Sequence, residues 1–346
     1  MVSGRWVVVA LLSAGCSTSF PAPDNYALGS EGDTGAEPPG CGDSPEAMAD
    51  CVEQARYLAD LEFVAMPRPP GDAHWQGVQD LCFDRFTELG YTVELQQYGT
   101  GINVIGTRQG LTTPEEMVVV AAHYDHLPDC DGADDNATGV AGVLEAARVL
   151  AEGQFDRSVV VACWDQEEIG KIGSRAWVQR TDDEGGGIVA NFNFEMIGYT
   201  DPTPGAQTIP FGFDSLFPEA IELVEAAEYR ADFITVIADD RANEMATSMV
   251  RHGERLGLPL IHLELASDIK NSPLLSDLRR SDHAPFWELN YPAMMITDTA
   301  NFRYGGYHCV DGQDTVDRLD HEFSTLVVRA TVAATAETLG LVDAPA

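Results

Sequence analysis

Two short runs of apolar, β-branched-rich residues constrain the fold of this chain more than any other feature. Residues 118–122 and 159–162 form runs of five and four apolar residues, and polar residues lie after the first run, at His123, and before the second, at Ser158. Such runs predict buried strands of a parallel sheet that is covered on both faces. His123 ends the first run, and Glu167 and Glu168 follow the second. Because open α/β sheets place active sites at the carboxyl ends of their strands, this pattern predicts a metal-dependent hydrolase.

Strand-like and helix-like segments alternate from residue 117 onward. Alternation of this kind predicts a three-layer α/β/α sandwich with a central, mostly parallel (mixed) sheet. Apolar runs and period-two alternation predict the strands, and apolar spacings of three and four residues predict the helices. We expect strands near 91–98, 103–106, 117–122, 158–164, 188–194, 233–237, 258–263 and 292–297, and helices near 46–64, 74–89, 139–151, 174–180, 215–229, 243–256 and 322–339.

The first 45 residues predict targeting and linker segments. Residues 1–16 combine an early arginine, a short apolar run and small residues before Cys16, which is the layout of an export signal with a bacterial lipobox-like end. Cys16 would then be acylated, and ordinary cleavage with release is the alternative. Residues 17–45 are rich in Pro, Gly, Ser and acid, so they predict a flexible linker. We expect residues 46–343 to form a single domain.

The charge balance excludes one large class of partners. The chain has 56 acidic and 20 basic residues, a net charge of −36, whereas nucleic-acid binding requires a basic surface. Solubility explains the acidity, and a salt-adapted surface is the alternative. We therefore expect an exported monomer, anchored in the cell envelope through a lipid on Cys16 or otherwise secreted, with no other membrane contact.

Six cysteines remain after Cys16, an even number in a chain with an export signal. They permit up to three disulfides, with the pairing open. Cys163 lies in an apolar run, so a plain buried thiol is an alternative for it. Cys130 and Cys309 flank candidate metal ligands, but the Cys-x-x-Cys spacing of thiolate zinc sites is missing. We favour disulfides for these two.

Two imidazoles and three carboxylates are predicted to meet at one edge of the sheet. Carboxylates crowded together raise each other's proton affinity, and a divalent cation removes this cost. A mixed nitrogen and oxygen set suits zinc better than calcium or magnesium. Five ligands exceed one tetrahedral site with an open position, but they fit two ions that share a carboxylate. The candidates are His123, Asp135, Glu168, Glu195 and His308.

Other histidines and aromatics near these motifs receive structural interpretations. We expect His126 and His283 to be ordinary polar residues that hydrogen-bond in loops. We expect Trp164, Trp177 and Phe286 to be core aromatics.

Six motifs, HYD, GADDNATG, QEEIGKIGS, NFEMIG, SDHAPFW and YHCVDGQDTVDRLD, follow one another in fixed order. In order and spacing they resemble the co-catalytic zinc aminopeptidases of the bacterial leucyl aminopeptidase type, metallopeptidase family twenty-eight. The resemblance covers about residues 103–339. It implies a peptidase domain that binds two Zn²⁺ and removes N-terminal residues from peptides.

The resemblance also assigns the ligands. His123 and Glu195 would hold one zinc, and Glu168 and His308 would hold the other. Asp135 would bridge the two ions, and the peptide bond after it would be cis. The family has aspartate where this chain has Glu195, a side chain that is one methylene longer. That departure affects both the binding of one ion and the selectivity for a free amine.

Further roles follow from the same resemblance. Glu167 would be the general base that takes a proton from the attacking water and passes it to the leaving amine. Tyr307 would donate a hydrogen bond to the developing oxyanion. Asp125 would orient His123, while Ser281 and Asp282 would support the ligands from behind.

Three other functions remain open at this point. A carboxypeptidase or amide hydrolase could use the same scaffold, and a glutaminyl cyclase would bind a single zinc. A surface binding protein that has lost catalysis is the alternative outside enzymology.

Overall fold

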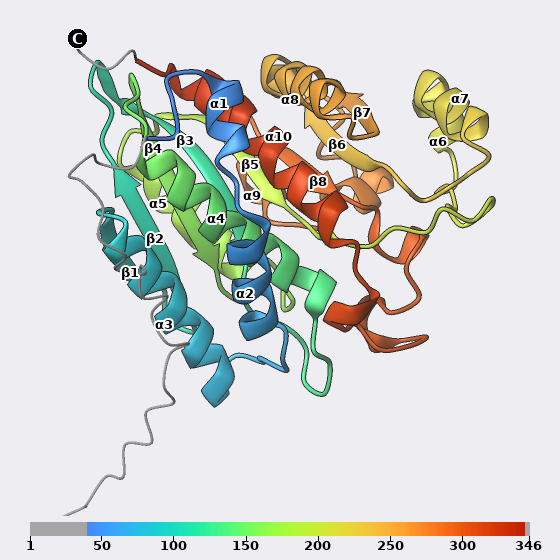
Figure 1. The fold of residues 1–346 in the computed structure, drawn as a ribbon, viewed down its shortest axis with the longest axis horizontal. Helices are drawn as coiled ribbons and strands as arrows, with labels where there is room; N and C mark the ends of the chain where they lie inside the picture. Colours follow the sequence, from blue (N-terminus) through green and yellow to red (C-terminus); the bar gives the residue numbers. More distant parts are fainter. Residues whose placement is uncertain (1–39, 343–346) are drawn as a thin grey trace, which may run out of the picture. The chain divides into compact units, whose positions relative to one another are not determined.

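The computed structural model describes residues 40–342, so the predicted export signal, Cys16 and most of the predicted linker lie outside the described residues. In the described part, eight strands form one sheet in the order β1-β2-β4-β3-β5-β8-β6-β7 (Figure 1). The central neighbours β4, β3, β5 and β8 are parallel, and the pairs β1/β2, β2/β4 and β6/β8 are antiparallel. The predicted mixed sheet is confirmed. The strands are β1 (Thr92–Gln97), β2 (Ile102–Arg108), β3 (Thr113–His123), β4 (Arg157–Trp164), β5 (Ile188–Phe194), β6 (Ile234–Asp239), β7 (Leu260–Leu265) and β8 (Met294–Thr297).

Helices cover both faces of this sheet, as the alternation of elements predicts. The larger core cluster packs α1, α2, α3, α4, α8 and α10 against one face, and the smaller one packs α5, α7 and α9 against the other. The helices are α1 (Pro45–Asp50), α2 (Gln54–Val64), α3 (Ala73–Glu88), α4 (Gly139–Ala151), α5 (Ile172–Asp183), α6 (Phe213–Leu216), α7 (Pro218–Ala226), α8 (Asn243–Leu256), α9 (His283–Glu288) and α10 (His321–Leu339), and the short turns are η1 (Ala133–Thr138), η2 (Asp240–Ala242), η3 (Pro273–Arg279), η4 (Ala300–Phe302), η5 (Tyr307–Cys309) and η6 (Val316–Arg318).

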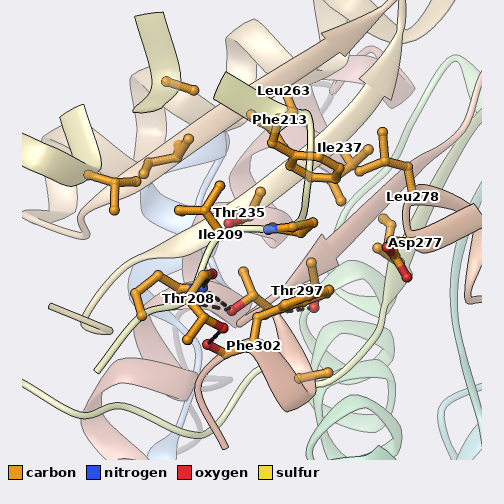
Figure 2. Close-up of a pocket in the computed structure, with 18 of the residues that line it drawn as sticks. Thr208, Ile209, Phe213, Thr235, Ile237, Leu263, Asp277, Leu278, Thr297 and Phe302 are labelled. Carbon is orange, nitrogen blue, oxygen red and sulfur yellow. Dashed lines mark hydrogen bonds between the residues drawn. The ribbon is translucent and has the colours of Figure 1, made fainter. Parts of the chain in front are cut away.

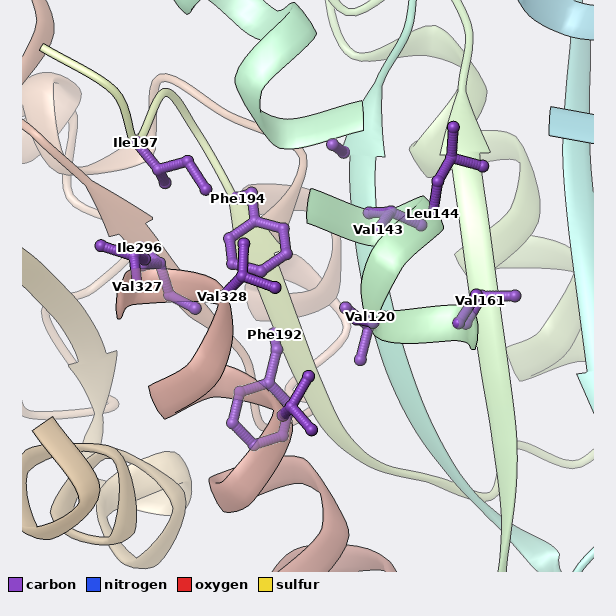
Figure 3. Packing of buried hydrophobic residues seen from close by; sticks show 14 of the residues in the cluster. Val120, Val143, Leu144, Val161, Phe192, Phe194, Ile197, Ile296, Val327 and Val328 are labelled. Atoms are coloured by element: carbon purple, nitrogen blue, oxygen red, sulfur yellow. The ribbon is translucent and has the colours of Figure 1, made fainter. Parts of the chain in front are cut away.

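The central strands carry apolar side chains on both faces. Along β3, Val118 and Val120 belong to the larger cluster, whereas Val119 belongs to the smaller one. Figure 3 shows Val120 and, from α4, Val143 among the side chains of the larger cluster. This double burial explains why the run lacks the polar alternation of a half-exposed strand. Trp164, Trp177 and Phe286 lie in the smaller cluster, which confirms them as core aromatics.

Two predicted helices are interrupted. The helix expected at 46–64 is α1 followed by α2, with a break at 51–53. The helix expected at 215–229 is α6 followed by α7, because Pro218 has no N–H with which to continue α6 and instead begins a new helix.

The described residues contain three disulfides, Cys41–Cys51, Cys82–Cys163 and Cys130–Cys309. The alternative of a plain thiol at Cys163 is therefore wrong. Disulfides of this number are typical of an oxidising compartment outside the cytoplasm. Between residues 40 and 342, no helix is both long enough and apolar enough to cross a membrane.

Candidate metal centre

The carboxyl ends of β3, β4 and β5 lie at one edge of the sheet, because these strands are parallel neighbours. Turns between other elements reach the same edge. The structure brings all five predicted ligands together there: His123 ends β3, Glu168 follows β4, Glu195 directly follows β5, Asp135 lies in η1, and His308 lies in η5.

These side chains form two donor groups that share one carboxylate. His123 Nε2 lies 3.3 Å from Asp135 Oδ1 and 3.4 Å from Glu195 Oε2. His308 Nε2 lies 3.1 Å from Asp135 Oδ2 and 3.2 Å from Glu168 Oε2. Asp135 therefore turns one oxygen toward each group. The peptide bond between Asp135 and Asn136 is cis, as the resemblance predicts.

The donor atoms fit metal ions better than they fit one another. His123 Nε2 and Asp135 Oδ1 are buried, and neither has a hydrogen-bond partner in the described structure. Leaving buried polar atoms unpaired is costly. Two ligands that lie 2.0–2.1 Å from a tetrahedral zinc are roughly 3.3 Å apart, which is close to the separations found in both groups. The residues present therefore fit two zinc ions.

Electrostatics at this edge also favour cations. Burial by itself would lower the pKa of His308, but the carboxylates of Asp135 and Glu168 raise it to about 10. Burial would raise the pKa of Asp135, yet His123 and His308 hold it well below its ordinary value. Without an ion, protons on the imidazoles balance the carboxylates. A bound cation would displace those protons, so binding would be coupled to proton release.

Glu167 and Tyr307 flank the donor groups. Burial raises the pKa of Glu167, and the carboxylates of Glu195 and Asp282 raise it further against the effect of His123. The Tyr307 ring stacks on His308, with ring centroids 3.9 Å apart. Burial and the charge of Asp135 raise the pKa of Tyr307, so its hydroxyl keeps the proton that a hydrogen-bond donor needs.

Hydrogen bonds hold several of these groups. Ser281 Oγ donates to Glu195 Oε2 at 2.5 Å. Asp125 accepts the backbone N–H groups of Glu167 and Glu168 at 3.0 and 3.3 Å. Its carboxylate also lies 3.5 Å from His123 Nδ1, whose nearer contact, at 3.1 Å, is the backbone carbonyl of Asp125.

Asp282, the other predicted supporting residue, contacts a different side chain. Its carboxylate accepts a hydrogen bond from Ser174 Oγ at 2.5 Å, and within residues 40–342 it makes no hydrogen bond to a predicted ligand. Burial raises its pKa to about 7.

Two residues that position the site were not predicted from the sequence. The fully buried guanidinium of Arg68 donates to the backbone carbonyls of Tyr124, Asp131, Gly132 and Asp135, and so fixes the turn before Asp135. Nothing local in the sequence marks this arginine. Asp314 accepts the backbone N–H groups of Asp134 and Asp135 at 2.9 and 3.0 Å. In the sequence, Asp314 is marked only by its place in the motif YHCVDGQDTVDRLD.

His126 differs from its prediction as an ordinary loop residue. Its side chain is buried, and in the described structure neither ring nitrogen has a hydrogen-bond partner. Its Nδ1 atom lies 2.7 Å from Glu168 Oε1, and with Asp135 and Glu168 it forms a group that could hold a metal ion. His283, in contrast, lies 2.9 Å from the Leu278 carbonyl through Nε2, which confirms the predicted hydrogen bond, although the residue begins α9 and does not lie in a loop.

A mostly apolar pocket adjoins the donor groups, and Glu195 and Tyr307 lie in its wall. Figure 2 shows Ile237 and Leu263, from β6 and β7, among the side chains that line it. Arg280 lines the pocket too, and its guanidinium carbon lies 5.2 Å from the Tyr307 ring centroid. The pocket could accept an apolar side chain next to the reacting groups.

Residues 103–240 match the family described as Peptidase family M28. Over these residues the chain is similar to that family. The match spans β2 to β6 and contains His123, Asp135, Glu168 and Glu195, whereas His308 lies beyond it.

Curated relatives add names of differing detail. The chain is 32% identical over 231 residues to the uncharacterised protein YfbL of Escherichia coli, a match over 61% of this chain and 64% of YfbL. It is 35% identical over 121 residues to the probable lipoprotein aminopeptidase LpqL of Mycobacterium tuberculosis, a match over 34% of this chain and 23% of LpqL. The chain thus covers less than two thirds of either relative.

Solved structures show the same fold. An aminopeptidase from Aneurinibacillus matches with a TM-score of 0.65 at 14% identity, over 87% of this chain and 97% of that chain. A glutaminyl cyclase from Macrostomum lignano matches with a TM-score of 0.61 at 17% identity, over 89% and 96%. The fold therefore does not separate these two activities.

Asp314→Asn tests how the shared carboxylate is held. One oxygen acceptor becomes an amide N–H₂ that faces a backbone N–H, so the turn carrying Asp135 should lose its fixed position. Because Asp135 belongs to both donor groups, we expect the affinity for both ions to fall roughly 10- to 100-fold, as for other lost supporting contacts of ligands. Chelator competition measures this, with the exposed Asp317→Asn in the same loop as control. Unchanged affinity in Asp314→Asn would contradict the assigned role.

Proposed function

We propose that this protein is an exported, two-zinc aminopeptidase that removes N-terminal residues from peptides. The observation that carries the proposal is the pair of donor groups that share Asp135, with Glu167 and Tyr307 beside them. The match of residues 103–240 to a peptidase family supports it. Three disulfides support export, and a lipid anchor on Cys16 and a monomeric state are further parts of the proposal.

His123, Asp135 and Glu195 would hold one zinc, and Asp135, Glu168 and His308 would hold the other. Zinc ions held there would lower the pKa of the attacking water and polarise the scissile carbonyl. Asp135 belongs to both sets of residues, so its position would also set where the substrate carbonyl must lie.

Glu167 is the general base in this proposal. Its raised pKa suits a carboxylate that takes a proton from water and later gives it to the leaving amine. Lys171 Nζ lies 3.7 Å from Glu167 Oε1 and stabilises the ionised form before the proton arrives. Tyr307 keeps its hydroxyl proton and donates it in a hydrogen bond to the oxyanion that develops on the carbonyl.

The surroundings of the pocket favour an N-terminal substrate residue. The carboxylates of Glu167 and Glu195 lie where a free α-ammonium group would meet negative charge. Arg280 is the cation in the pocket wall that could bind a substrate carboxylate, but other groups already occupy part of its guanidinium. Nη1 donates to Asn301 Oδ1 at 2.6 Å, and the guanidinium lies over the Tyr307 ring. The apolar pocket beyond would take the side chain of that residue. Two donor groups also favour this function over a single-zinc cyclase.

Glu167→Gln tests the general base. The amide preserves the shape of the side chain but cannot take a proton, so kcat on aminoacyl anilides should fall 10²- to 10⁴-fold. Zinc content should stay at the wild-type level, and Glu184→Gln, an exposed substitution after α5, should change neither quantity. Near-normal turnover in Glu167→Gln, or full wild-type activity after complete metal removal, would end this mechanism.

Blocked peptides separate the aminopeptidase from its alternatives. We expect peptides with a free N-terminus and an amidated C-terminus to be hydrolysed. N-acetylation should lower kcat/KM at least tenfold, since it removes the ammonium charge that the carboxylates attract. Mass spectrometry of the products identifies the end that is cleaved. Release of the C-terminal residue from acetylated peptides would instead establish a carboxypeptidase, and inactivity on all peptides with two zincs bound would support a binding protein.

A further inference from the structure

We propose that His126 is a protein ligand of the ion that Asp135 and Glu168 hold, in addition to His308. The inference rests on the proposed two-zinc site and adds an imidazole that the family resemblance does not assign. His126 follows His123 by three residues, in the loop that leaves β3. Its backbone N–H donates to the carbonyl of Arg68 at 3.2 Å, so the buried arginine that fixes the turn before Asp135 also fixes His126.

The first argument is burial without a partner. His126 is 1% exposed, and in the described residues both of its ring nitrogens lack a hydrogen bond. Glu168 Oε1, the carboxylate oxygen nearest to it, is also buried and unpaired. Burying an imidazole and a carboxylate oxygen without a hydrogen bond to either costs free energy. A third group that binds both atoms would remove this cost.

The second argument is the direction of the donor atoms. Nδ1 of His126 lies 2.7 Å from Glu168 Oε1, yet the contact is not aligned as a hydrogen bond. His123 Nε2 and Asp135 Oδ1 show the same combination of closeness and missing alignment. Donor atoms that lie side by side without pointing at each other converge on a common point, as ligands of one ion do. Two ligand atoms that each lie 2.0–2.1 Å from such an ion, at 90° to each other, are roughly 2.9 Å apart. The distance from His126 Nδ1 to Glu168 Oε1 is close to this value.

The third argument is the arrangement around Glu168. Oε1 faces His126 and Oε2 faces His308, while Asp135 lies within reach of both imidazoles. The two rings are edge to face, with centroids 6.0 Å apart, so both can approach one ion without clashing. The second ion would then have four protein residues around it, whereas His123, Asp135 and Glu195 give the first ion three. We therefore expect the second site to bind its ion more tightly.

His126→Asn tests the inference in the full-length protein, with Co²⁺ as the probe. The asparagine amide can donate a hydrogen bond from near the Nδ1 position, but it cannot replace an imidazole nitrogen as a ligand. Titration of metal-free protein against a chelator should show the affinity for one ion lowered at least 100-fold and the other within threefold of wild type. Two wild-type-like affinities would overturn the inference and leave His126 as a hydrogen-bond donor to Glu168.

A matched control is His252→Asn, which also replaces a buried imidazole. His252 lies on α8, and its Nε2 atom lies 3.0 Å from Glu337 of α10. The next residue, Thr338, accepts a hydrogen bond through its backbone carbonyl from Arg157, at the start of β4. That is the edge opposite the donor groups, so both Co²⁺ affinities should match wild type. A wild-type protein that binds at most one ion would overturn the two-zinc proposal, and this inference with it.

A spectroscopic measurement on the wild-type protein does not depend on the folding of the variant. In the proton NMR spectrum of the di-cobalt protein, each coordinated imidazole contributes one strongly shifted, exchangeable N–H signal. We expect three such signals, from His123, His126 and His308. Two signals would overturn the inference.

Discussion

Asp135 is the point on which the rest of the site depends. Its two carboxylate oxygens face two different imidazoles, and the side chain is almost fully buried. Held this way, one residue determines the separation of the two donor groups. The surrounding structure fixes its backbone from two sides, through Asp314 on the N–H groups and Arg68 on the carbonyl groups.

The disulfide Cys130–Cys309 joins the loop before η1, which carries Asp135, to η5, which carries His308. Cys130 lies in the loop before η1, and Cys309 directly follows His308. The covalent link restrains a loop whose histidine is partly exposed, and whose own contacts at the site are with carboxylates. An oxidising compartment, in which this disulfide persists, would therefore support the geometry of the candidate metal centre as well as overall stability.

Glu195 shows how the chain accommodates its departure from the family. The longer side chain still brings Oε2 to 3.4 Å from His123 Nε2. Ser281 holds that oxygen, and Asn193 in turn donates to the Ser281 hydroxyl at 2.7 Å. The additional methylene is therefore matched by a chain of hydrogen bonds that fixes where the carboxylate ends.

Local patterns in the sequence were enough for the strands and for the residues at their ends. The apolar run of β3 and the polar His123 after it are neighbours in the chain, so periodicity and position predict both. Arg68, Asp314 and His126 act through contacts with distant segments, and a single sequence does not reveal such contacts. The same holds for the breaks in the helices at 51–53 and before Pro218, because the apolar spacing that predicts a helix continues across each break.

The central claim is that Asp135 bridges two zinc ions. Anomalous diffraction from crystals of the zinc-loaded protein, collected on both sides of the zinc absorption edge, tests it most directly. The account predicts two zinc peaks, each within roughly 2.0–2.2 Å of a different oxygen of Asp135. A single peak, or two peaks of which one does not touch Asp135, would contradict it.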